Sequence, residues 1–147
     1  MEESCKDYDS PDEVLKRASQ EDPIVMYLIV RESLNMSPGK IGAQCAHAAQ
    51  MLMILYNQTV SEHLCGWNVT FNKSIFEEWL ESSFRKVVLK ADEKEWLKIK
   101  TECKDEMVLV IDAGLTEIPS GSETVIGLWP RHRGGNSKLL KRLQVLK

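Results

Sequence analysis

Residues 24–31 have the sequence IVMYLIVR, a nearly unbroken apolar run with the length of one β-strand. A strand with one solvent-facing side alternates apolar and polar residues, whereas a strand buried on both faces is apolar throughout. Such strands are usual in sheets that carry helices on both sides. The run therefore predicts a central strand of an α/β domain, followed by a turn over residues 32–39.

The segments after this strand alternate between helical and strand patterns. A long helix is predicted over residues 38–56, with Ser37 as its N-cap and Pro38 in its first position. Further expected elements are a short helix at 75–81, a strand at 86–90, a helix from an Asp92 cap to about Cys103, strands at 107–111 and 124–129, and a last helix at 137–143. The strands at 107–111 and 124–129 are joined without a helix, so a wide hairpin would make the mostly parallel sheet mixed.

The composition of the whole chain fits one intracellular domain. Of its 147 residues, 43% are hydrophobic and 28% are charged, which is normal for a globular protein with a single core and no disulfides. No apolar run is long enough to cross a bilayer, and the polar, acidic beginning lacks the apolar stretch of a signal peptide. We expect a cytoplasmic protein.

The four cysteines point to neither a metal site nor a disulfide framework. They lie at positions 5, 45, 65 and 103 and form no CxxC pair, so zinc binding is disfavoured. Cys45 and His47 raise the alternative of a nucleophile and its base. Residues two apart on a helix point to different sides, so this pair is poorly placed.

Charge divides the chain into an acidic polar arm, residues 1–23, and a single domain, residues 24–147. The arm holds eight acidic and three basic residues, a net charge of −5, whereas the domain has a net charge of +2. From Thr124 to the end there are six Lys or Arg and no acidic residue. Such a local excess favours contact with a polyanion, and the alternative is a solvated basic terminus.

The most informative segment is the start of the predicted long helix. Lys40 lies in its first turn, where the helix dipole disfavours a cation by about 0.3–1 kcal/mol, so a carboxylate or an anionic ligand is expected opposite it. Lys40, Gln44 and His47 are spaced i, i+4 and i+7, which predicts a polar stripe on a mostly apolar helix. The alternatives are a surface lysine and a core histidine bonded to the backbone.

A second informative segment follows the strand at 107–111. Asp112 lies at the end of that strand, where active-site groups of α/β folds commonly lie. Gly114 and Gly121 shape the loop after it, and Thr116 and Thr124 supply hydroxyl groups close to it in sequence. A lysine nearby would keep this carboxylate ionised. The alternative is a turn in which Asp112 bonds only to local backbone N–H groups.

Three stretches of the chain resemble the archaeal and eukaryotic type of peptidyl-tRNA hydrolase. Residues 40–49, KIGAQCAHAA, are similar to the family's GK-x-AAQ-x-(S/A)HA motif. Residues 112–125, DAGLTEIPSGSETV, are similar to its DAG-x-T-x-I-x-x-G-(S/T)-x-T motif. Between them, residues 86–97, KVVLKADEKEWL, resemble its second strand and the helix after it. The resemblance covers about residues 24–130.

This resemblance implies a fold and a set of site residues. The implied fold is a three-layer α/β/α arrangement around a four-stranded mixed sheet. Residues at the positions implicated in catalysis are Lys40, Asp112 and Thr116. Those at other motif positions, expected to line the substrate site, are Gln44, His47 and Thr124. Neither a metal ion nor another cofactor is implied, in agreement with the absence of ligand clusters from the sequence.

The implied substrate is peptidyl-tRNA, and the implied reaction is hydrolysis of its ester bond. Because no Ser/His/Asp nucleophile order is evident, direct attack by water is favoured over an acyl-enzyme. Contacts to tRNA phosphates are expected from the basic residues after Thr124, namely Arg131, Arg133, Lys138 and Lys141.

The chain also departs from the family pattern. Trp129 stands where the family has a small residue that we expect near the site, and residues 131–147 match the family poorly. Two alternatives therefore stay open. One is a non-catalytic module of the same fold that binds RNA or protein, and the other is a hydrolase of a different ester or amide. Whether the protein forms a homodimer is also left open.

Overall fold

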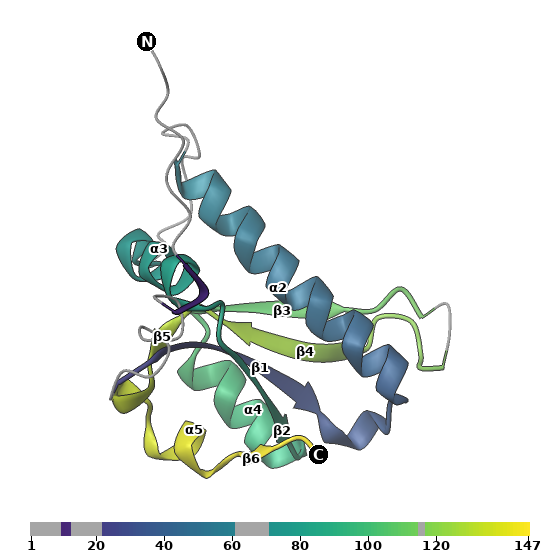
Figure 1. The fold of residues 1–147 in the computed structure, drawn as a ribbon. Helices are drawn as coiled ribbons and strands as arrows, with labels where there is room; N and C mark the ends of the chain where they lie inside the picture. Colours follow the sequence, from purple (N-terminus) through teal and green to yellow (C-terminus); the bar gives the residue numbers. More distant parts are fainter. Residues whose placement is uncertain (1–9, 13–21, 61–70, 115–116) are drawn as a thin grey trace.

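One mixed sheet organises the computed structural model, which describes residues 10–12, 22–60, 71–114 and 117–147 (Figure 1). Its central strand is β1 (Ile24–Arg31), which pairs in parallel with β2 (Lys86–Ala91) and antiparallel with β4 (Glu123–Leu128). The strand β3 (Met107–Ile111) pairs antiparallel with β4. The predicted wide hairpin and the mixed sheet are therefore confirmed.

The expectation of four strands is wrong, because the described residues form six. The additional strands are β5 (Arg131–His132), which pairs with β1, and β6 (Gln144–Val145), which pairs with β2. The resulting order is β3-β4-β1-β2-β6, with β5 off this path. Each additional strand has only two residues, too few to show alternation in a sequence.

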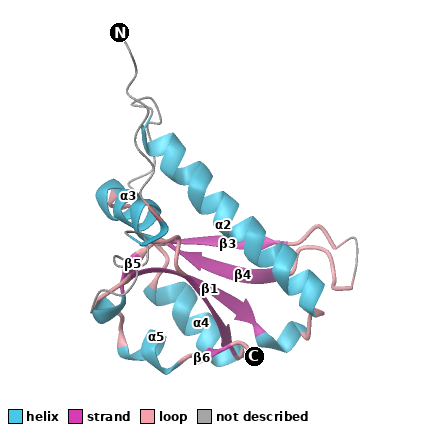
Figure 2. Ribbon diagram, in the orientation of Figure 1, coloured by secondary structure: helices cyan, strands magenta, loops and turns pink. Residues whose placement is uncertain are grey.

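Helices cover both faces of the sheet, and Figure 2 shows α2 and α3 on one side with α4 and α5 on the other. Their bounds are α2 Pro38–Val60, α3 Lys73–Ser82, α4 Glu93–Glu102 and α5 Lys138–Arg142. Two short 3-10 turns, Glu32–Leu34 and Arg133–Gly135, follow β1 and β5. None of the described helices has the length and apolarity needed to span a membrane.

The all-apolar sequence of β1 follows from this double covering. Met26, Leu28 and Val30 pack in the core beneath α2 and α3, whereas the alternate residues of the strand pack in the core on the α4 side. A strand between two cores has no solvent-facing position except at its ends, where Ile24 and Arg31 are only partly buried. The predicted bounds of β1 and β3 agree with the structure residue for residue.

Trp129 is part of the core at the end of β4 that lies beside Met107, and not near Asp112. It is 4% exposed and stacks on Phe71 with ring centroids 4.5 Å apart. Its indole N–H donates to the backbone oxygen of Asn72 at 3.0 Å. The expectation that Trp129 lies near the site is therefore wrong.

The end of β1, the start of α2 and the connection between β3 and β4 lie at the same end of the sheet. Because β3 and β1 both pair antiparallel with β4, they run in the same direction and end at the same edge. The start of α2 follows β1 there, and the described parts of the connection from β3 to β4, residues 112–114 and 117–122, lie there too (Figure 1). This is the edge at which α/β folds place their ligands. Most of the acidic arm over residues 1–23 lies outside the described residues.

Candidate active site

A capping contact joins the N-terminus of α2 to the loop between β3 and β4. Ser37 caps the helix as predicted, because its Oγ accepts from the Lys40 backbone N–H at 3.3 Å. The backbone N–H and the hydroxyl of Ser37 donate to the Glu117 carboxylate at 2.8 and 2.5 Å. These donors lower the pKa of Glu117. No local pattern in the sequence pointed to Glu117, which is 80 residues away from Ser37.

Lys40 and Asp112 form an ion pair at this junction. The Lys40 Nζ lies 2.8 Å from the Asp112 Oδ1, and the two side chains are only 10% and 9% exposed. The hydrogen bond from Lys40 is the largest cause that lowers the pKa of Asp112, and partial burial opposes it. Asp112 is therefore ionised at neutral pH. The carboxylate expected opposite the lysine in the first turn of the helix is present.

The other oxygen of Asp112 closes a tight local turn. The Gly114 N–H donates to Oδ2 at 2.9 Å, while the backbone N–H and C=O of Asp112 bond to Ser122 and Gly121, both at 2.9 Å. Gly114 has a φ of 72°, and a Cβ on it would lie 2.2 Å from the Cα of Ser120. Asp112 therefore makes both the local turn and the long-range pair. The alternative in which it bonds only local N–H groups is wrong.

Gln44 and Thr124 lie behind Asp112 and are fully enclosed, with 2% and 0% of their surfaces exposed. Thr124 Oγ1 donates to Gln44 Oε1 at 2.5 Å, and Gln44 Nε2 donates to Asp112 Oδ1 at 3.3 Å. The two residues thus hold the carboxylate from the core side. Both residues therefore lie next to Asp112, but neither lines an open surface.

His47 does not join this cluster. It is exposed on α2, and its imidazole makes no hydrogen bond with a side chain or backbone group of the described residues. Of the three polar residues predicted to share one face of this helix, only Lys40 and Gln44 contact Asp112. Cys45 is 8% exposed in the core, and burial raises the pKa of its thiol, which disfavours the nucleophile pair with His47. Thr116 lies outside the described residues.

The basic residues after β4 lie away from the ion pair. Arg131 pairs beside Val25 at the start of β1, whereas α2 begins beyond the other end of that strand. The length of β1 separates them by on the order of 20 Å. Arg131 is held by the Glu106 carboxylate. Arg133 lies in the turn after β5, and Lys138 and Lys141 are exposed on α5.

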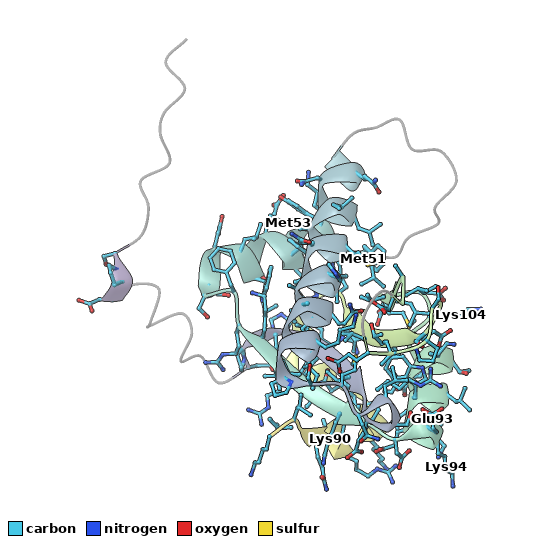
Figure 3. All side chains as sticks on the ribbon, turned by 90° about the vertical axis from the view of Figure 1, so that its right-hand side faces the viewer. Met51, Met53, Lys90, Glu93, Lys94 and Lys104 are labelled. Atoms are coloured by element: carbon cyan, nitrogen blue, oxygen red, sulfur yellow. The ribbon has the colours of Figure 1, made fainter. Side chains whose placement is uncertain are left out.

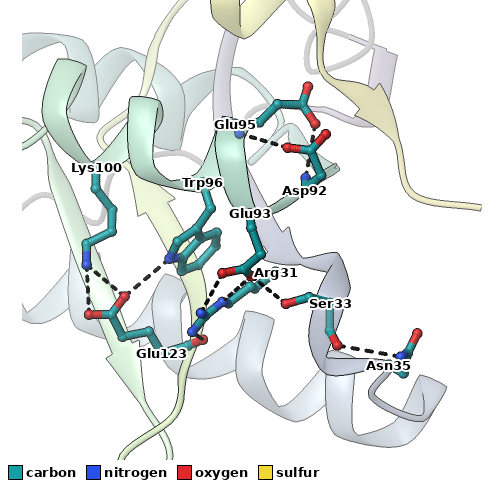
Figure 4. Close-up of polar contacts among 9 residues, drawn as sticks. All are labelled: Arg31, Ser33, Asn35, Asp92, Glu93, Glu95, Trp96, Lys100 and Glu123. Carbon is teal, nitrogen blue, oxygen red and sulfur yellow. Dashed lines mark hydrogen bonds and ion pairs between the residues drawn. The ribbon is translucent and has the colours of Figure 1, made fainter.

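A second polar cluster supports the same end of the sheet from the α4 side (Figure 4). The Arg31 guanidinium donates to both oxygens of Glu93 at 2.7 and 2.8 Å and to the backbone oxygen of Glu123 at 3.4 Å. Ser33 also donates to Glu93. Because Arg31 ends β1 and Ser33 lies in the turn before α2, Glu93 fixes the approach of the chain to Lys40. The pKa of Glu93 is lowered to about 2 by its hydrogen bonds from Arg31 and Ser33.

The chemistry of the site follows from its charges. The Lys40 ammonium group is paired with the largely buried carboxylate of Asp112, and both lie at the N-terminus of α2, the positive end of its helix dipole. The three hydrogen bonds to Asp112 leave an acceptor position on Oδ2 of a carboxylate that has about four. Among the described residues, no group of three or more His, Cys, Asp or Glu could hold a metal ion.

Comparison with known proteins connects this site to one family. The family model of peptidyl-tRNA hydrolase PTH2 matches residues 24–146. Peptidyl-tRNA hydrolase 2, mitochondrial, of Mus musculus is 37% identical over 109 residues, which are 71% of this chain and 54% of that protein. Peptidyl-tRNA hydrolase of Thermoplasma acidophilum is 30% identical over 125 residues, which are 82% of this chain and 97% of that protein. The chain thus spans about half the length of the mouse relative and nearly all of the archaeal one.

Proposed function

This chain belongs to the peptidyl-tRNA hydrolase PTH2 family, and we propose that it hydrolyses the ester bond between peptide and tRNA in peptidyl-tRNA. The observation that carries the proposal is the ion pair of Lys40 and Asp112, 2.8 Å apart at the start of α2. Lys40 belongs to the first motif of the family resemblance, residues 40–49, and Asp112 belongs to the second, residues 112–125.

In this proposal water attacks the ester carbonyl directly. A bond forms between the water oxygen and the carbonyl carbon, and negative charge collects on the carbonyl oxygen. The bond from that carbon to the terminal ribose oxygen then breaks, and the ribose oxygen takes up the proton that the attacking water loses. The products are a peptide with a free carboxyl group and a tRNA with a free terminal hydroxyl.

Lys40 and Asp112 divide the work of this step. The Lys40 ammonium stabilises the developing oxyanion, and Asp112 orients the lysine and accepts a hydrogen bond from the attacking water. The lowered pKa of Asp112 makes it a poor proton acceptor, so we assign it orientation and not general-base catalysis. Thr116 positions water or substrate in this proposal.

Basic residues away from the ion pair would hold the tRNA. We propose phosphate contacts for Arg131, Arg133, Lys138 and Lys141 because tRNA is a long ligand that can reach from one end of the sheet to the other. The exposure of Arg133, Lys138 and Lys141 supports this role. We also propose that His47, which is exposed on α2, contacts the peptidyl-tRNA.

The same proposal includes the layer arrangement, the cellular location and the oligomeric state of the protein. The two hydrophobic cores on opposite sheet faces support the three-layer α/β/α arrangement that the resemblance implies. A cytoplasmic location and a homodimer stay predictions, and the name of the mouse relative places that protein in mitochondria. Cell fractionation and sedimentation of the full chain test them.

The experiment is a turnover assay of the full chain on N-acetyl-aminoacyl-tRNA. We expect release of the N-acetyl amino acid with many turnovers per protein molecule. Unacylated tRNA in a binding assay is the companion measurement. Binding without release of the amino acid would contradict the proposal and would favour the non-catalytic RNA-binding module.

A further inference from the structure

The strand β3 forms an outer edge of the sheet and leads directly to the ion pair. It is the first strand in the order β3-β4-β1-β2-β6, and it lies at the margin of the sheet in Figure 2. Within the described part of the chain, β4 is the only strand that pairs with it. Asp112 follows its last residue, Ile111, so the strand runs toward the pair of Lys40 and Asp112.

The outer edge of β3 presents backbone groups at alternate residues. The Trp129 N–H donates at 2.9 Å to the oxygen of Glu106, the residue before β3. Because backbone bonding alternates along an antiparallel pair, every second residue from Glu106 onward bonds to β4. The irregularity near the end of this pair places the extra residue in β4, so β3 keeps its alternation. The N–H and C=O groups that point outward are those of Met107, Leu109 and Ile111.

This edge lacks two features that commonly keep an edge strand from pairing with another chain. Such strands often carry a charged residue or a proline, whereas residues 107–111, MVLVI, include neither. The side chain of Ile111 is apolar and yet 62% exposed. The strand can therefore accept a further extended chain through backbone hydrogen bonds.

We propose that the outer edge of β3 binds the peptide of peptidyl-tRNA as an added strand. This inference rests on the proposed function and names the peptide-binding surface of that same site. The ester carbonyl is the C-terminal end of the peptide, and in the proposed reaction it lies at Lys40 and Asp112. The peptide therefore runs toward the ion pair in the same direction as β3, and the two strands are parallel.

Recognition through the backbone suits a substrate whose peptide has no fixed sequence. Backbone N–H and C=O groups are the same in every residue except proline, which lacks the N–H. The five residues of β3 extend over a length on the order of 17 Å. A bound peptide would thus pair through about four residues, and every second one would bond to β3.

The first experiment measures amide hydrogen exchange by NMR in the ¹⁵N-labelled full chain. The ligand is N-acetyl-tetraalanine linked to 3′-amino-3′-deoxyadenosine, in which an amide replaces the ester. At saturation, exchange should slow about three- to tenfold at Met107, Leu109 and Ile111, as expected for one hydrogen bond each. The amides of Val108 and Val110 face β4 and should change little.

The matched control ligand is 3′-acetylamino-3′-deoxyadenosine, which has no peptide. It should leave exchange along β3 unchanged, because only the peptide contacts this edge in the proposal. Exchange that is not slowed by the tetraalanine ligand, or is slowed equally at all five amides of β3, would overturn the proposal.

Turnover of N-methylated substrates tests the alternation from the side of the peptide. Methylation removes one amide hydrogen at a time from N-acetyl-tetraalanyl-tRNA. Methylation at the positions that face β3 should lower kcat/KM about three- to tenfold, the effect of one backbone hydrogen bond. The positions between them are the matched control and should change it little. Equal losses at all positions, or no loss at any, would overturn the proposal.

The two measurements separate this proposal from the hydrolase proposal. The exchange experiment needs no turnover, so slowed exchange at alternate residues of β3 without hydrolysis would support the peptide-binding surface and contradict the hydrolase. Hydrolysis of N-acetyl-aminoacyl-tRNA without slowed exchange would contradict the peptide-binding surface alone.

Discussion

Asp112 divides its carboxylate between neighbours in sequence and partners far from it. Oδ2 accepts from Gly114 two residues away, while Oδ1 accepts from Lys40 and Gln44, 72 and 68 residues away. The local bond fixes the carboxylate relative to its own loop, and the distant bonds fix it relative to α2. Both sets are needed to hold an ammonium group at a defined place at the sheet edge.

Thr124→Val tests whether the buried relay positions Asp112. The substitution keeps the shape but leaves Gln44 Oε1 without its donor, which should lower the free energy of unfolding by about 1–3 kcal/mol. It should also lower kcat, because the Gln44 amide is then free to turn away from Asp112. Denaturant unfolding and turnover measure the two effects.

Two variants control this prediction. Thr124→Ser keeps the hydroxyl and should restore most of the kcat. Thr101→Val removes a hydroxyl whose bond to the Leu97 oxygen is exposed, and should change stability by no more than about 0.5 kcal/mol. Equal kcat values for Thr124→Val and the unmodified protein would remove the relay from the mechanism.

Gly114→Ala tests whether the loop needs its close backbone approach. A Cβ at Gly114 would lie 2.2 Å from the backbone of Ser120, whereas a Cβ at Gly121 would have open space around it, although both have positive φ. Gly121→Ala should therefore cost only the left-handed penalty of about 1–2 kcal/mol. Gly114→Ala should cost more and reduce turnover more. Similar losses in the two variants, measured by unfolding and activity, would contradict this explanation.

At the scale of elements, local signals were sufficient for most helices and strands. Ser37 and Asp92 cap their helices as predicted, because a cap bonds to backbone only three residues away. The two-residue β5 and β6 could not be predicted, since they exist only through neighbouring strands. The roles of Glu117 and Glu93 could not be predicted for the same reason, because their partners are 80 and 62 residues away.

The Arg31–Glu93 pair gives a prediction about pH. The folded-state pKa of Glu93, about 2, lies below the ordinary 4.5, so the stabilisation is complete above pH 4.5 and is lost as the pH falls through about 2. Glu93→Gln should therefore destabilise the protein at pH 7, and the difference from the unmodified protein should vanish near pH 2.

Urea unfolding at several pH values measures this difference. Glu78→Gln is the control, because Glu78 is exposed on α3 and makes no ion pair with a described residue. It should change stability little at pH 7. A Glu93→Gln difference that stayed constant between pH 7 and pH 2 would show that the carboxylate charge is not the source of the stabilisation.

At the scale of the whole molecule, the ion pair and the basic C-terminal residues lie at opposite ends of β1. The sequence predicted both groups but could not predict their separation, which depends on how the strands pair. The expected position of Trp129 is wrong for a related reason. It is near Thr124 in sequence, but one strand length carries it to the other end of the sheet.

The salt dependence of tRNA binding tests the role of the basic residues. Each phosphate that a basic side chain neutralises should contribute about 0.7–0.9 to the slope of log affinity against log salt. Neutralising Arg133, Lys138 and Lys141 together should thus flatten the slope by about two to three. The matched control neutralises Lys94, Lys98 and Lys104, three exposed lysines on or just after α4, of which Lys94 and Lys104 are labelled in Figure 3. Equal slopes for the two triple variants would place the tRNA elsewhere.

The central claim is that Lys40 and Asp112 act together in ester hydrolysis, and turnover of N-acetyl-aminoacyl-tRNA tests it most directly. Lys40→Met, Asp112→Asn and the double variant should each lose about 10²–10³-fold in kcat. The double variant should lose little more than either single one, because the residues act as a unit. Lys90→Met, which breaks the exposed pair with Glu32 at the same end of the sheet (Figure 3), should keep full activity. Full turnover in a folded Lys40→Met or Asp112→Asn variant would contradict the claim.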